Sequence, residues 1–278
     1  VEGDEVGSQT LVFAPRRVAP GTYEVDVGTA GSATLVLQTV LPPLLTADGP
    51  TTLRVTGGTH NPWAPPYDFL ERVYLPVIRS LGPEVAIDLL RAGFAPAGGG
   101  RIEVVVRPAE RLAALDLCER GAIRARRAEA LLANLPRHVA ERELKVVARR
   151  LGWPEEELHV RELDGVGGMG NALLLEIAFA HGVELVFEPG RPGLPAERVA
   201  QRAVTQVFRW LDADVPVGEH LADQLLLPLA LGSGGTFRTL ALSSHAKTQI
   251  DLIGRFVDVV FEVEPSIGSS VLVRVTPR

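Results

Sequence analysis

A group of four polar side chains opens an otherwise apolar segment near the C-terminal end: Glu219, His220, Asp223 and Gln224. The residues that follow, Leu225 to Leu231, are almost all apolar. A polar group that is buried without a partner costs roughly 1–3 kcal/mol, so polar residues at the mouth of a buried segment usually have specific partners. We therefore interpret residues 218–248 as a candidate site rather than as a plain core helix.

The same stretch contains His245, which follows a short β-like segment at 236–242. A helix is expected from His245 to Phe256, with Ser243 or Ser244 as its N-cap. The first turn of a helix offers free N–H groups and the positive end of the dipole, which favour phosphate. Such a position also favours a neutral imidazole nitrogen that acts as nucleophile or base. A histidine that is covalently modified at phosphorus and a capping or core histidine both fit these residues.

Composition excludes several classes of protein. The chain has 278 residues, of which 46% are hydrophobic, enough for one large or two ordinary domains. The net charge of −6 gives no general nucleic-acid signature, and nothing points to DNA. No apolar stretch reaches the roughly 18 residues of a membrane span, and no secretory signal is visible. The chain has a single cysteine, Cys118, which excludes an intrachain disulfide and fits the cytoplasm. We interpret Cys118 as a half-buried small residue rather than as a nucleophile.

Apolar periodicity predicts alternating strands and helices in the first part of the chain. The expected strands are 9–13, 22–27, 51–56 and 102–106, and the expected helices are 33–46 and 68–81. Repeated β-α-β packing follows, so the predicted fold class is α/β or α+β. Gly98 to Gly100 lead into a strand with no Gly-Lys-Ser/Thr and no helix behind them, which excludes a Walker loop and a dinucleotide fingerprint.

Two further residues of the first part could face a ligand. Gln38 is the one large polar side chain in the apolar segment 33–46. It either forms a hydrogen bond with a neighbouring backbone group or recognises a ligand. Pro65 lies in the proline-rich loop 60–66, which is expected to be rigid and extended. With Trp63, this loop suits either a pocket wall or a simple strand-to-helix connection.

The sequence pattern changes in the middle of the chain, which indicates an inserted unit. An amphipathic helix at 136–150, strands at 172–179 and 183–188, and a helix at 196–211 make up a self-contained set of elements. Its three histidines match no compact metal motif: His138, His159 and His181. After it, a helix at 218–231 and strands at 257–264 and 270–275 complete the chain. The predicted domains are 1–118 and 215–278, which form one large domain, and 119–214, inserted into it.

Six segments together resemble the RNA 3′-terminal phosphate cyclase family. They are TAGSATLVLQTVLP (29–42), GGTHNPWAPPYDF (57–69), RAGFAPAGGG (91–100), PRHVAERE (136–143), VGEHLADQLLLPLAL (217–231) and SSHAKT (243–248). These segments are long, specific and spread over nearly the whole chain in the family's order.

The resemblance implies an ATP-dependent conversion of RNA 3′-phosphate ends to 2′,3′-cyclic phosphates. A histidine, here His245, would attack the α-phosphorus of ATP and form a covalent His–AMP before AMP passes to the RNA end. The positions that hold adenine and ribose map onto Gln38, Pro65, His220, Leu221, Ala222, Asp223 and Gln224. Asp223 is the expected metal-side carboxylate, with Mg or Mn offsetting the triphosphate charge. His220 stands where some members have Tyr, and an imidazole can also stack on adenine.

The fold implied by the resemblance is a large domain of β-α-β-α-β-β repeats, like the C-terminal domain of translation initiation factor 3, with a small inserted α/β domain. The family begins with a strand, a glycine-rich segment with a metal-binding Glu, and basic residues, which this sequence lacks. A weak or inactive chain with exposed apolar surface on its large domain is the resulting expectation. A homodimer is one option that the sequence leaves open.

Two other functions are weighed against this one. A cyclase-like factor of ribosome assembly shares the implied fold, but His245 argues against it, because those relatives lack the catalytic histidine. A carboxyvinyl-transfer enzyme has related repeats, but the basic phosphoenolpyruvate cluster of that family is absent here.

Overall fold

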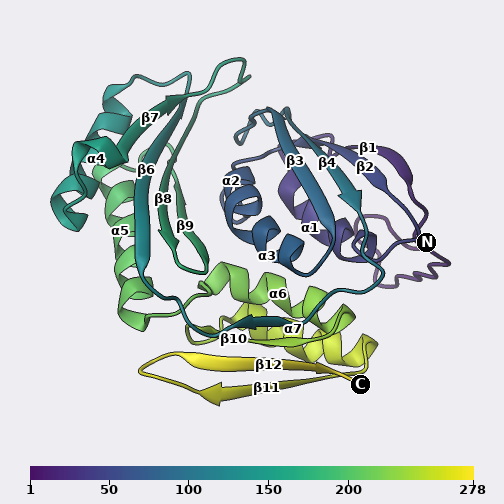
Figure 1. The fold of residues 1–278 in the computed structure, drawn as a ribbon. Coiled ribbons are helices and arrows are strands. Elements are labelled where there is room, and N and C mark those ends of the chain that lie inside the picture. Colours follow the sequence, from purple (N-terminus) through teal and green to yellow (C-terminus); the bar gives the residue numbers. More distant parts are fainter.

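The computed structural model describes all residues, 1–278, and contains three four-stranded sheets with helices packed against them (Figure 1). Each sheet has both parallel and antiparallel pairs. The predicted mixed α/β class is confirmed. None of the helices combines the length and the apolar character that crossing a membrane requires.

The first unit has the order β-α-β-α-β-β. Its elements are β1 (Gly21–Asp26), α1 (Ala33–Leu44), β2 (Thr51–Gly57), α2 (Tyr67–Phe69), the π-helical turn η1 (Leu70–Tyr74), α3 (Leu75–Ser80), β3 (Glu84–Arg91) and β4 (Gly100–Arg107). The strand order is β1-β2-β4-β3, with β1 parallel to β2 because α1 connects them. α1 begins after Ser32, whose side chain accepts the Leu35 N–H, and buries Leu37 and Leu41.

The last unit repeats this topology with an interruption. Its elements are β5 (Leu115–Leu117), α6 (Glu219–Leu231), β10 (Gly235–Thr239), α7 (Ser244–Phe256), β11 (Val259–Pro265) and β12 (Val271–Pro277). The order β5-β10-β12-β11, with β5 parallel to β10, matches β1-β2-β4-β3 strand for strand. The chain leaves this unit after β5 and returns to it only at α6. Two copies of the β-α-β-α-β-β repeat are thus present.

The intervening segment forms a third unit with helices on one face of its sheet (Figure 1). Its elements are β6 (Ile123–Ala133), α4 (His138–Leu151), the 3₁₀ turn η2 (Glu155–Glu157), β7 (Leu158–Glu162), β8 (Gly170–Phe179), β9 (Gly182–Pro189) and α5 (Ala196–Ala213). The strand order is β7-β6-β8-β9. We call these elements the inserted unit. The domain boundaries at 118 and 214 remain a prediction.

Two hydrophobic clusters support these units. One of 42 buried residues lies under the first and last units, and one of 22 lies mainly between the inserted sheet and its helices, so the inserted unit has a core of its own. Residues of β6, β8 and β9 also reach the larger cluster, among them Leu131, Leu174 and Leu185. The inserted unit is therefore packed against the rest. On α7, Leu252 and Phe256 are 52% and 83% exposed.

Some predicted elements differ from the structure. Residues 9–13, predicted as a strand from their alternation, make only an isolated bridge between Glu2 and Val12. Leu11, Val12 and Phe13 are exposed, so no neighbouring strand pairs with this segment and that prediction is wrong. The strands β3, β5 and β7 were not predicted, and the strand expected at 236–242 ends earlier, at Thr239.

One buried carboxyl group in the inserted unit makes stability depend on pH. Glu143 of α4 is fully buried; Asn171 Nδ2 donates to its Oε2 at 3.1 Å, and Oε1 has no partner. Burial raises the pKa of Glu143 to about 7, and the Asn171 hydrogen bond only partly opposes this. A carboxyl whose pKa is raised on folding binds more protons in the folded state, so stability falls as pH rises through the window between the two pKa values.

We expect Glu143→Gln to stabilise the chain at about pH 8 by on the order of 2 kcal/mol, and by much less near pH 5, because glutamine resembles the protonated acid and does not ionise. Urea unfolding followed by the fluorescence of the buried Trp153 and Trp210 measures the difference. Glu141→Gln, on the exposed face of the same helix, is the control and should change little. A difference that is the same at both pH values would contradict the assignment.

Candidate active site

The start of α6 carries most of the residues predicted as a site. His220 is exposed, and Asp223 and Gln224 are half-buried. Leu221 and Ala222, which lie between His220 and Asp223 in the sequence, are each only 2% exposed and belong to the core. The helix thus buries its apolar face and presents a short polar edge, as the sequence pattern predicts.

The start of α7 supplies the predicted histidine. Ser243 is the N-cap, and its Oγ accepts the N–H of Ala246 at 3.1 Å. The helix begins at Ser244, so His245 lies in its first turn, where its side chain is exposed. The predicted helix and cap are confirmed. First-turn N–H groups and the positive end of the dipole favour an anion beside His245.

Asp223 connects the two helix starts. Burial raises the pKa of Asp223, while the charges of His220 and His245 and a backbone hydrogen bond from Gln224 oppose this. α6 and α7 contact each other although a strand separates them in sequence, and the charges of both histidines act on Asp223. Gln224 Oε1 is buried beside them without a hydrogen-bond partner. This oxygen is therefore free to accept a hydrogen bond.

The two remaining predicted residues come from the first unit. Gln38 is half-buried on α1, a helix that contacts α6. Pro65 is half-buried in the loop between β2 and α2. Neither makes a hydrogen bond to the α6 and α7 residues. The structure therefore brings together His220, Asp223, Gln224 and His245 and leaves Gln38 and Pro65 on neighbouring elements.

Comparison with known proteins bears on the identity of this arrangement. The sequence model of the RNA 3′-terminal phosphate cyclase family matches residues 1–263. RNA 3′-terminal phosphate cyclases of Ectopseudomonas mendocina and Pseudomonas fluorescens are each 51% identical, over 93% and 95% of this chain and 75% and 77% of their own. The chain belongs to the RNA 3′-terminal phosphate cyclase family. The cyclase of Koribacter versatilis is 46% identical over 95% of this chain and 74% of its own.

The loop with Pro65 is held by a buried network that the sequence analysis missed. His60 and Asp68 are both completely buried at the side chain, and His60 Nε2 lies 2.8 Å from Asp68 Oδ2. The other ring nitrogen, Nδ1, lies 2.8 Å from Thr59 Oγ1, and the ring stacks on Phe94. Nε2–H therefore donates to the carboxylate, and Thr59 donates to Nδ1. Since both ring nitrogens have partners, His60 fixes the path of the loop.

Asp68 extends this network into the inserted unit. Its Oδ1 accepts a hydrogen bond from Arg161 of β7 at 2.7 Å and forms an ion pair with Arg72 of η1 at 3.0 Å. Arg72 also reaches Glu129 and Glu176, at 2.6 and 3.0 Å. Burial alone would raise the pKa of Asp68, but the hydrogen bond from His60 and the charges of the two arginines hold it below its usual range. The network ties the cyclase chain's inserted unit to the loop with Pro65.

Trp63 belongs to the same loop and lies outside the cavities described here. Its side chain is 93% exposed and its φ is +67°, an unusual conformation for a non-glycine residue. The interpretation of this loop as a simple connection fits Trp63 better than a pocket wall.

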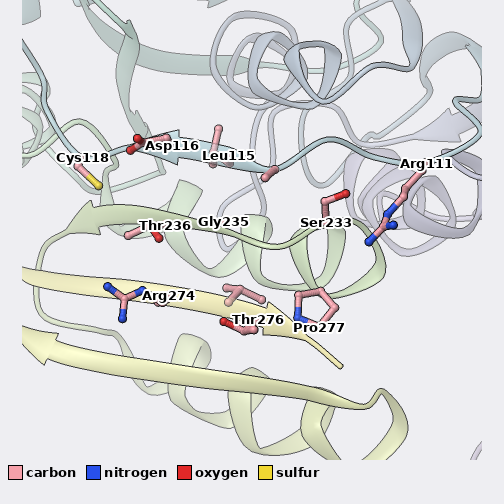
Figure 2. Close-up of a pocket in the computed structure, with 12 residues that line it drawn as sticks. Arg111, Leu115, Asp116, Cys118, Ser233, Gly235, Thr236, Arg274, Thr276 and Pro277 are labelled. Carbon is pink, nitrogen blue, oxygen red and sulfur yellow. The ribbon is translucent and has the colours of Figure 1, made fainter.

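A separate cavity of about 540 Å³ lies on the outer face of the sheet formed by β5, β10 and β12 (Figure 2). Arg111 and Arg274 lie toward its two ends, and it contains none of the predicted site residues. Cys118 lines it, and burial, together with Asp116, raises the pKa of this thiol. A raised pKa disfavours the thiolate, which agrees with the interpretation of Cys118 as a half-buried small residue.

Proposed function

We propose that this chain catalyses the ATP-dependent conversion of RNA 3′-phosphate ends to 2′,3′-cyclic phosphates. The observation that carries the proposal is the position of His245 in the first turn of α7, beside Asp223 and His220. The matched family and the relatives at 51% identity are RNA 3′-terminal phosphate cyclases, which supports the same reaction. The alternative, an assembly factor without catalysis, leaves this histidine without a use.

His245 is the nucleophile in this proposal. Its ring nitrogen attacks the α-phosphorus of ATP, the bond to the oxygen that bridges the α- and β-phosphorus breaks, and pyrophosphate leaves. The adenylyl group then passes from His245 to an oxygen of the RNA 3′-phosphate. The adjacent 2′-hydroxyl attacks that phosphorus, the ring closes and AMP leaves. Amides of the first turn of α7 would stabilise the negative charge that develops on the α-phosphate oxygens.

Adenine and ribose would be held by α6 and by the first unit. The exposed His220 ring offers a stacking face, and the unpartnered Gln224 Oε1 accepts an N–H or O–H donor. Pro65 and Gln38 provide further contacts from the neighbouring elements. The side chains of Leu221 and Ala222 are buried, so we assign these two residues backbone contacts and packing that supports the helix.

A divalent cation, Mg or Mn, would take Asp223 as its ligand from this chain. No three His, Cys, Asp or Glu side chains come together in the structure to form a complete protein site. Magnesium typically binds one or two carboxylates and completes its shell with substrate phosphates and water. This matches a single carboxylate beside a triphosphate, where the ion would offset the phosphate charge.

The test uses two RNA oligonucleotides that end in a 3′-phosphate and differ only in the terminal 2′ position. With ATP and Mg, the ribose end should become resistant to phosphatase and appear as a 2′,3′-cyclic phosphate. The 2′-deoxy end cannot close the ring and should accumulate as the adenylylated oligonucleotide. α-Labelled ATP should also label the protein itself. Absence of labelled protein and of both RNA products, together with association with pre-ribosomal RNA, would contradict the proposal in favour of the assembly factor.

A further inference from the structure

The inserted unit contacts the polar start of α6 through a buried carboxylate. Glu184 of β9 is only 8% exposed, and both oxygens of its carboxyl group lie against the backbone of Gly218, whose N–H lowers the pKa of this group. Gly218 is the N-cap residue of α6, immediately before the turn that contains His220. A side-chain methyl group at position 218 would overlap both Glu184 carboxylate oxygens, so the fit between strand and helix start is tight.

This carboxylate takes the place of a missing cap. The first N–H groups of a helix have no partner within the helix, and Ser, Thr, Asp or Asn at the N-cap usually accepts one of them. Gly218 has no side chain with which to do so. Glu184 therefore caps α6 from a different unit of the molecule.

A second contact acts on the same turn. Arg209 of α5, in the inserted unit, donates to Glu219 Oε2 at 2.8 Å. The chain passes from α5 to α6 through a short connection, and Asp214 in it pairs with Arg120, on the segment that enters the inserted unit, at 2.7 Å. The start of α6 is thus held from the strand side by Glu184 and from the helix side by Arg209.

Burying an acidic group at position 184 costs desolvation free energy, which indicates that the group has a function there. Burial raises the pKa of Glu184 to about 8, only partly opposed by the Gly218 N–H, and its Oε2 has no hydrogen-bond partner. Buried acidic groups without a paired charge are rare because their desolvation is unfavourable. An apolar side chain of similar size would fill the space without this cost, but it would leave the Gly218 N–H unpaired.

We propose that Glu184 is a positioning residue for nucleotide binding: by capping α6 from the inserted unit, it fixes the turn that presents His220, Asp223 and Gln224 to ATP. This gives the inserted unit a role in the nucleotide site to which it contributes no contact residue. The inference rests on the proposed function for its ligand, while the capping itself is a property of the fold.

The first test measures ATP binding to the full chain by equilibrium dialysis. Glu184→Ala should raise the Kd for ATP roughly three- to tenfold, the loss expected for one helix cap. Glu184→Gln should bind nearly as wild type, because its amide oxygen can still accept the Gly218 N–H. Glu188→Ala is the matched control: it removes a carboxylate from the same strand that contacts Arg202 and Gln206 of α5, and it should leave the Kd unchanged.

A double-mutant cycle tests the contact directly. Gly218→Ala is compatible with the backbone, whose φ is −72°, but its methyl group displaces the Glu184 carboxylate, so ATP binding should weaken. In the Glu184→Ala background the same methyl group has space, and its effect should be much smaller. Equal effects in the two backgrounds would show that the two residues act independently and would overturn the proposal.

Hydrogen exchange separates failure of this inference from failure of the proposed function. Amides of residues 218–222 should exchange roughly tenfold faster in Glu184→Ala, while Glu184→Gln and Glu188→Ala should match wild type. If the wild-type chain binds no ATP, the proposed function fails and exchange alone decides whether Glu184 caps α6. Unchanged hydrogen exchange at residues 218–222 in Glu184→Ala overturns the inference, whatever the measured Kd for ATP.

Discussion

Replacement of His245 by alanine should abolish labelling of the protein by α-labelled ATP, with the rate of adenylyl transfer falling by roughly 10⁴-fold or more. The loss is large because His245 is the proposed attacking group, while His220 begins a different helix and is assigned to stacking on adenine. The label on the wild-type protein should be acid-labile, as a phosphorus–nitrogen bond is. A denaturing gel run before and after acid treatment measures both properties.

A matched control is available in the inserted unit. His138 is exposed and begins α4, so it is also a histidine in a first helical turn. His138→Ala should keep full labelling, because His138 belongs to the inserted unit and not to the candidate site formed by α6 and α7. The α7 cap from Ser243 to the Ala246 N–H does not involve the His245 side chain, so the His245 variant should fold. Full labelling of His245→Ala would contradict the role of this residue as nucleophile.

The helix starts of the candidate site could be predicted from sequence because their signals are local. Ser243 provides a capping hydroxyl three residues before the N–H that it accepts from, and Gly218 precedes a polar edge followed by an apolar run. What periodicity cannot show is that α6 and α7 contact each other and that the charges of both histidines act on Asp223. That depends on the way the repeat folds α6 and α7 onto the same sheet.

The errors in the strand predictions also have physical reasons. Residues 9–13 alternate as a strand does, but alternation stabilises a strand only when a neighbour accepts its hydrogen bonds and a core accepts its apolar face. β5 has only three residues, too few to show a sequence pattern. It is a strand because it pairs with β10, which follows the inserted unit in the sequence. Contacts that are distant in sequence decide both cases.

The network around Asp68 could not be predicted for the same reason, and it leads to the second large effect. Asp68→Ala should destabilise the chain by about 3–5 kcal/mol, as expected when one member of a buried charged network is removed. The substitution leaves the Nε2–H of His60 without an acceptor and Arg161 without its carboxylate partner. Arg72 keeps Glu129 and Glu176, so the cost arises mainly at His60 and Arg161. Urea unfolding near neutral pH measures it.

Two variants separate the buried network from ordinary surface charge. Asp68→Asn keeps the shape of the side chain and one acceptor oxygen. Its loss of stability should therefore be smaller than that of Asp68→Ala but still measurable. Glu162→Gln breaks the exposed pair between Glu162 and Arg137, which join at 2.9 Å beside Arg161, and should cost no more than about 1 kcal/mol. Equal losses for Asp68→Asn and Glu162→Gln would show that the buried network contributes no more than a surface pair.

The pH dependence gives an independent test of Asp68. Because its pKa is lowered on folding, its contribution to stability is complete above the unfolded pKa of 3.8 and is lost as pH falls through the lower folded value. Wild type should therefore lose stability steeply below about pH 4, and Asp68→Asn, which cannot be protonated there, should lose less. The two unfolding curves should converge in acid and separate toward neutral pH. Since the same carboxylate holds both Arg161 and the His60 loop, acid should loosen the inserted unit and the loop with Pro65 together.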